Sequence, residues 1–119
     1  MRLKEVITAA DEQKPNAFTN EQKTRWINDI EGKMQTEIFL FAPPQVICYT
    51  YEKDKNCELL ADPPHDQIYI SYLNTMIDFA NGEYDRYGNT QQLFNSQYKE
   101  FMRWFAQNYR PADMMEDHV

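Results

Sequence analysis

The residues of this 119-residue chain that could carry covalent chemistry are two thiols and one imidazole in the body of the chain. Cys48 and Cys57 are the only cysteines, and His65 lies within twenty residues of both. A thiol becomes a nucleophile when a positioned base removes its proton, so Cys48 with His65 is the pair that a thiol enzyme would use. The alternative interpretation is that Cys48 is a small buried apolar residue.

Metal binding requires several ligands at close spacing, and the sequence does not provide them. His65–Asp66 is the only histidine beside an acid in the body of the chain, and no second histidine or close cysteine pair accompanies it. The charge of Asp66 suits the first turn of a helix instead. We therefore expect no metal and no cofactor.

Acid–base catalysis would require carboxyl groups with shifted pKa values. Acidic residues lie near one another at Asp29 and Glu31, at Glu83 and Asp85, and at Glu116 and Asp117. All three pairs occur in polar stretches, where water keeps pKa values ordinary. Neither Ser71 nor Ser96 lies in a GxSxG nucleophile motif. The sequence predicts a protein that is not an enzyme.

The formal net charge of −7 argues against general nucleic-acid binding, which needs basic side chains to displace counterions from phosphates. No apolar run approaches the length that spans a membrane, and the first residues, MRLKEVITAADEQ, are too charged for a signal peptide. Two cysteines are too few for a disulfide framework. These features predict a protein made in a reducing cytosol.

Apolar spacing predicts a short helix over residues 2–11 and a long one over about 20–38. Thr19 is the expected N-cap of the long helix, with Gln22 completing a capping box and Phe18 as part of a hydrophobic staple. Its apolar stripe includes Trp26, Ile30 and Met34. We expect Glu21, Arg25, Asp29, Gly32 and Gln35 on the opposite, polar face.

After the APP sequence at 42–44, the period changes to two over residues 46–51, and the polar turn EKDKN separates this run from CELLA. This pattern predicts a β-hairpin or an extended loop over residues 45–61. A third helix is expected with Asp62 as its N-cap and Pro63 or Pro64 at its first position. It is expected to end at Asn81–Gly82, where the glycine supplies a left-handed conformation. The last helix is expected from about Thr90 to Asn108, after the connector EYDRYGN. Its predicted apolar stripe consists of Leu93, Phe94, Tyr98, Phe101, Met102, Phe105 and Tyr109.

The predicted fold is thus mainly α, with about four helices in a small bundle and one hairpin or extended loop between the second and third helices. We expect residues 1–112 to form one helical domain and residues 113–119 to form a flexible C-terminal tail. The chain has eight tyrosines, seven phenylalanines and two tryptophans, more aromatic surface than one small core needs. Because aromatic side chains with polar tips are favoured at interfaces, we expect self-association.

Three stretches, RWINDIEG, YLNTMIDFANGEYDRYGN and YRPA, together with the helical layout over residues 2–112, resemble the small head–tail connector (adaptor) proteins of tailed phages and prophages of Gram-positive bacteria. The resemblance implies a homo-oligomeric ring, commonly of twelve copies, beneath the portal protein of the virion. Such a ring extends the DNA channel without binding DNA specifically and docks a stopper or tail protein. The subunits would be made in the cytoplasm of the bacterial host.

The expected subunit contacts are made by four of the surplus aromatic residues, Trp26, Tyr84, Tyr87 and Trp104, and by Tyr49 and Tyr51 of the predicted hairpin. On the resemblance, the expected portal-docking segment contains Tyr109, Arg110, Pro111, Met114 and Met115. The family offers no catalytic residues. Two other hypotheses remain open at this stage: a small cytosolic regulatory module whose acidic surface binds a basic partner, and an enzyme that uses Cys48 or His65.

Overall fold

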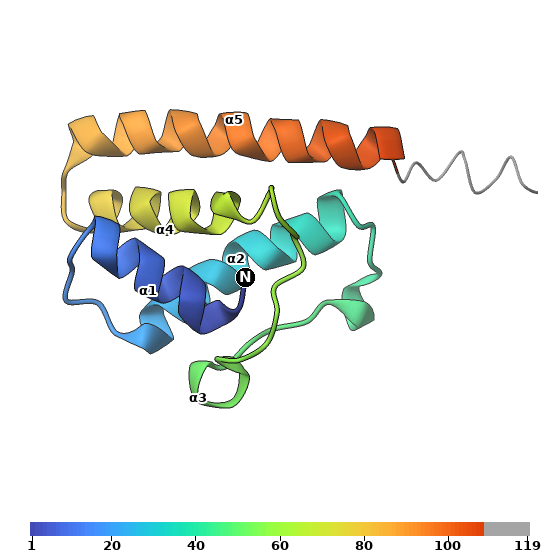
Figure 1. The fold of residues 1–119 in the computed structure, drawn as a ribbon, viewed down its shortest axis with the longest axis horizontal. Helices are drawn as coiled ribbons and strands as arrows, with labels where there is room; N and C mark the ends of the chain where they lie inside the picture. Colours follow the sequence, from blue (N-terminus) through green and yellow to red (C-terminus); the bar gives the residue numbers. More distant parts are fainter. Residues whose placement is uncertain (109–119) are drawn as a thin grey trace, which may run out of the picture.

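The computed structural model describes residues 1–108, which form five α-helices and one short 3₁₀ turn (Figure 1). The elements are α1 (Leu3–Gln13), α2 (Asn20–Glu37), the 3₁₀ turn η1 (Pro43–Gln45), α3 (Tyr51–Asp54), α4 (Gln67–Ala80) and α5 (Tyr84–Asn108). The described part contains no β-strand. The predicted mainly α class is therefore confirmed.

Helix α4 lies at the centre of the fold, with α5 along one side and α1 and α2 on the other (Figure 1). Its sequence QIYISYLNTMIDFA has apolar residues on more than one face, which is typical of a helix that packs on both sides. Tyr69, Leu73 and Ile77 are among its buried side chains. They pack in one core with residues of α1 and α2, such as Val6 and Ile30.

Helix α2 begins where its sequence predicts. Thr19 Oγ1 accepts a hydrogen bond from the backbone N–H of Gln22 at 3.0 Å, and the Phe18 ring packs edge-on against Trp26. The reciprocal half of the capping box is absent, because the Gln22 side chain accepts from Arg25 instead.

Helices α4 and α5 begin at other residues than the sequence predicts. The backbone N–H of His65 closes a turn onto the carbonyl of Asp62, so α4 begins at Gln67 and Asp62 does not cap it. Gly82 ends α4 in the left-handed conformation that was expected, with φ of 73°. The connector EYDRYGN is itself helical, because the N–H of Tyr87 donates to the carbonyl of Glu83, so α5 starts six residues before Thr90.

The segment between α2 and α4 is an extended loop, and the predicted strand pairing does not form. Residues 46–50 run beside α2, and α3 makes one helical turn beyond them. The returning residues pair with the start of the chain: Leu3 N–H donates to the Cys57 carbonyl, and Leu59 N–H donates to the Met1 carbonyl, both at 3.0 Å. The two halves of the predicted hairpin therefore have different partners.

Candidate functional site

One flank of α2 carries three polar side chains that hold the loop in place: Asn28, Glu31 and Gln35. Their spacing of three and four residues puts them on one side of a helix. Glu31 and Gln35 are fully buried. The prediction that Gln35 lies on the solvent face is wrong, since this flank faces the loop rather than water.

The two amides bind the loop backbone in the manner of a neighbouring strand. Asn28 accepts from the N–H of Tyr49 and donates to the carbonyl of Tyr49, both at 2.8 Å. Gln35 does the same with Ile47, at 2.7 and 3.0 Å. Each amide thus satisfies both backbone groups of one loop residue, which explains how an extended segment is stable here without a β-sheet.

Between these amides, the Glu31 carboxylate accepts three hydrogen bonds. Tyr49 Oη donates at 2.8 Å, Tyr69 Oη makes a short hydrogen bond, and the backbone N–H of Leu60 donates at 3.1 Å. Tyr69 Oη in turn accepts from the N–H of Ala61. The network joins α2, α4 and both sides of the loop.

Burial raises the pKa of Glu31, and the three hydrogen bonds oppose this shift only in part. Burial also raises the pKa values of the Tyr49 and Tyr69 hydroxyls, and the neighbouring Glu31 carboxylate adds to both shifts. Both tyrosines are therefore protonated donors at every physiological pH. The arrangement is suited to holding the loop, because both hydroxyls are engaged and Glu31 has no contact with solvent.

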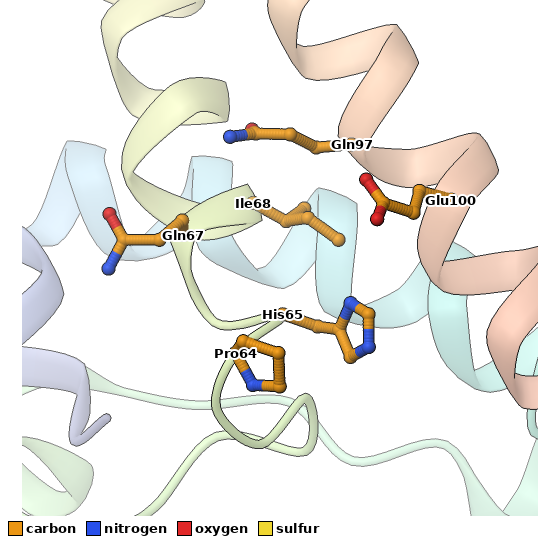
Figure 2. A pocket seen from close by; sticks show the side chains of 6 residues that line it. All are labelled: Pro64, His65, Gln67, Ile68, Gln97 and Glu100. Carbon is orange, nitrogen blue, oxygen red and sulfur yellow. The ribbon is translucent and has the colours of Figure 1, made fainter.

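A surface pocket of about 180 Å³ lies between the start of α4 and the middle of α5 (Figure 2). Its lining residues are Pro64, His65, Gln67, Ile68, Gln97 and Glu100. The His65 ring packs against Phe101 and Trp104, with centroid distances of 5.0 and 4.8 Å. Gln97 Oε1 is buried without a hydrogen-bond partner within the described part. The pocket offers acceptor groups and an imidazole, and neither cysteine lines it.

The thiols have ordinary structural surroundings. Cys48 is exposed, so the alternative that it is a buried apolar residue is wrong. Cys57 is also exposed, and its thiol lies 3.7 Å from Asp54 Oδ1.

Among residues 1–108, no three His, Cys, Asp or Glu side chains are grouped so that they could hold a metal ion. No helix of this part has the length and apolar character needed to cross a membrane.

The residues predicted to form subunit contacts differ in their exposure. Trp26 and Tyr49 are buried within the single chain, and Tyr51 packs partly against the core. Tyr84 is 66% exposed, and Trp104 is 38% exposed. Tyr87 is half-buried, with its ring 5.2 Å from that of Phe79. The structure thus leaves Tyr84 and Trp104 with the most surface to offer a partner.

Sequence reasoning missed several exposed apolar side chains. Leu93 and Met102 were assigned to the buried stripe of the last helix, but they are 54% and 37% exposed. Of that stripe, Phe94, Tyr98 and Phe101 are buried against the rest of the chain. The spacing could have indicated that Leu93 is exposed, because it lies about 100° around the helix from Phe94, which is buried. The predicted portal-docking residues, from Tyr109 to Met115, lie outside the described residues.

Comparison with protein-family models, with curated proteins and with solved structures gives no match for this chain.

Proposed function

We propose that this protein is a virion structural protein, a head–tail connector that acts by assembling into a ring beneath a portal. The supporting observation is the distribution of exposed apolar side chains. Of the seven large apolar side chains exposed within residues 1–108, five belong to α4 and α5: Phe79, Tyr84, Leu93, Met102 and Trp104. Exposed large apolar side chains that gather on two helices of a small protein are candidates for an interaction surface.

The exposed side chains of α5 fall on two opposite sides of the helix. Leu93 and Trp104 are eleven residues apart, which places them within about 20° of each other, and we call this pair the Leu93 flank. Tyr84 and Met102 are eighteen residues apart, which is five full turns, and we call this pair the Tyr84 flank. The two flanks are separated by about 170°, with the buried residues Phe94 and Phe101 between them.

Two different flanks on opposite sides of one helix suit a head-to-tail contact. The Leu93 flank of one copy would pack on the Tyr84 flank of the next, so that an open row of copies has one unused flank at each of its two ends. Such heterologous contacts generate rings when the rotation between copies closes. A surface built for a two-fold dimer would instead need only one self-complementary flank.

The charge of the chain is compatible with a channel for DNA. At a net charge of −7 per copy, a ring repels the phosphate backbone rather than binding it. A genome would therefore pass through such a ring without adhering to its wall.

Reconstitution on portal-bearing heads that lack their own connector tests this function. The wild-type protein should add a ring beneath the portal, visible by electron microscopy. Leu93→Glu should abolish the ring, because it places a charge within the subunit contact, and it should leave the fold intact because Leu93 is exposed. The matched control Gln92→Glu introduces the same charge at a neighbouring exposed position of α5 and should still form rings. Failure of the wild-type protein to bind such heads would refute the proposal.

The C-terminal segment is tested separately by truncation after Pro111. The truncated chain should keep the helical signal and melting temperature of the full chain, because its removed residues lie beyond the described helices. It should no longer attach to portal-bearing heads. Normal attachment would show that Met114 and Met115 have no part in docking.

A further inference from the structure

Two hollows lie side by side where the turn before α4 meets the second half of α5. The first is the pocket of about 180 Å³ that His65 and Glu100 line together with four other residues. The His65 ring contacts both Phe101 and Trp104, whose own rings stack at a centroid distance of 6.2 Å. These three rings separate the first hollow from the second, which has about 130 Å³ and is lined by Phe39, Leu60, Asp62, Phe101, Trp104 and Phe105.

Each hollow has one exposed carboxylate on its lining. Figure 2 shows the Glu100 side chain projecting from α5 toward the His65 ring at the first hollow, and Asp62 lines the second. Among residues 1–108, neither carboxylate has a hydrogen-bond or ion-pair partner, not even Lys99 or Arg103, which are close to Glu100 in sequence. No lysine or arginine lines either hollow. Both hollows therefore present negative charge that the described chain does not neutralise.

The size and chemistry of the hollows narrow the class of ligand. Pockets for drug-sized molecules have about 300–1,000 Å³, so each of these hollows suits no more than one side chain. A carboxylate favours a cation, and the aromatic rings favour a guanidinium group, which stacks on rings and pairs with a carboxylate through two N–H groups. Gln97 Oε1, buried beside the first hollow without a hydrogen-bond partner in the described part, becomes a further acceptor if the side chain changes its rotamer.

We propose that the two hollows bind a basic segment of another protein chain, with one arginine side chain beside Glu100 and a second beside Asp62. Two adjacent sites of the same chemistry favour a segment over a single small cation, because linking two contacts raises their joint affinity. The net charge of −7 also favours a basic partner, since opposite charge speeds the encounter and excludes acidic competitors.

Titration of the full chain with acetylated and amidated tri-arginine, followed by calorimetry and by the NMR signals of the indole N–H groups, tests the proposal. Binding should be saturable, should weaken as salt is added, and should shift the signal of Trp104 but not that of Trp26. Tri-lysine should bind more weakly, because an ammonium group does not stack on rings as a guanidinium does, and uncharged tri-citrulline should not bind. Acetyl-arginine amide fills one hollow only and should bind at least about tenfold more weakly than tri-arginine. Equal affinity of the two would identify a small cation as the ligand and would contradict the proposal.

Two substitutions locate the binding site. Glu100→Gln and Asp62→Asn should each weaken the binding of tri-arginine about two- to fivefold, the range of an exposed ion pair, and the double variant should weaken it by the product of the two. The control double variant Glu12→Gln, Asp85→Asn removes the same charge at exposed positions outside both hollows and should retain nearly the wild-type affinity. Equal weakening by the control, or full binding by the Glu100→Gln, Asp62→Asn variant, would overturn the proposal. The titration uses the unassembled protein and does not depend on the ring proposed above, so either proposal can fail without the other.

Discussion

At the scale of single residues, Glu31 is the group whose charge state affects the fold most directly. Burial raises its pKa above the ordinary value of 4.5. The folded chain therefore keeps this proton at pH values where the unfolded chain has lost it. Between 4.5 and the raised pKa, the folded chain binds more protons than the unfolded chain, so the free energy of unfolding falls as pH rises.

We predict that Glu31→Gln removes this part of the pH dependence. The wild-type chain should lose up to about 1.4 kcal/mol of unfolding free energy per pH unit through Glu31 over that window, relative to the variant. Urea unfolding at a series of pH values above 4.5 measures the difference. The control Glu21→Gln, an exposed acid on the same helix, should leave the wild-type slope unchanged. Parallel curves for wild type and Glu31→Gln would show that Glu31 does not titrate abnormally.

The amide side chains of Asn28 and Gln35, which we call the amide clamp because they hold the loop backbone, give a second prediction at this scale. Gln35→Ala leaves the backbone N–H and carbonyl of Ile47 without their partners, which should cost about 1–3 kcal/mol of stability. Hydrogen exchange at the amides of Ile47 and Tyr49 should accelerate at the same time. Gln22→Ala, on the same helix and without a loop contact, is the matched control. Unchanged exchange in Gln35→Ala would contradict the role given to the clamp.

At the scale of elements, the two glycines around the start of α5 should respond in opposite ways to alanine. Gly88 lies inside α5, and a Cβ atom there would meet nothing within 4 Å. Gly88→Ala should therefore stabilise the protein by about 0.5–1 kcal/mol. Gly82 has φ of 73°, a conformation that alanine adopts with strain, so Gly82→Ala should destabilise it. Thermal unfolding of both variants tests the pair, and a destabilised Gly88→Ala would contradict a continuous α5.

The helices could be predicted wherever a local rule decides the structure. Thr19 caps α2 through its own side chain, and Gly82 ends α4 by its own backbone conformation. The loop could not be predicted this way, because its hydrogen bonds come from distant residues. The alternation over residues 46–51 predicts a paired strand, whereas residues 46–50 bind the Asn28–Gln35 flank of α2, up to 21 residues away in sequence, and Tyr51 begins α3. The two-residue alternation of side-chain types alone does not distinguish a helix flank from a second strand as the partner.

At the scale of the whole molecule, the proposed interface was predictable only in part. Tyr84 and Trp104 were selected as aromatic side chains in excess of the core, and they are exposed. Trp26 was selected for the same reason and Tyr49 as part of the predicted hairpin, but both are buried within the chain, where Trp26 packs on Phe18 and Tyr49 donates to Glu31. Leu93 and Met102 were missed because the number of residues that α4 covers on α5 depends on how the two helices pack. Only three α5 side chains are buried, so the stripe is narrower than its sequence suggests.

The most direct test of the central claim is to ask which flank meets which. In a Cys48→Ser, Cys57→Ser background, three proteins are oxidised on portal-bearing heads: Leu93→Cys alone, Tyr84→Cys alone, and the two substitutions together. Head-to-tail assembly predicts a ladder of disulfide-linked oligomers from the doubly substituted chain and only monomers from each singly substituted chain. Disulfide-linked dimers from either singly substituted chain, or no ladder from the doubly substituted one, would contradict the account.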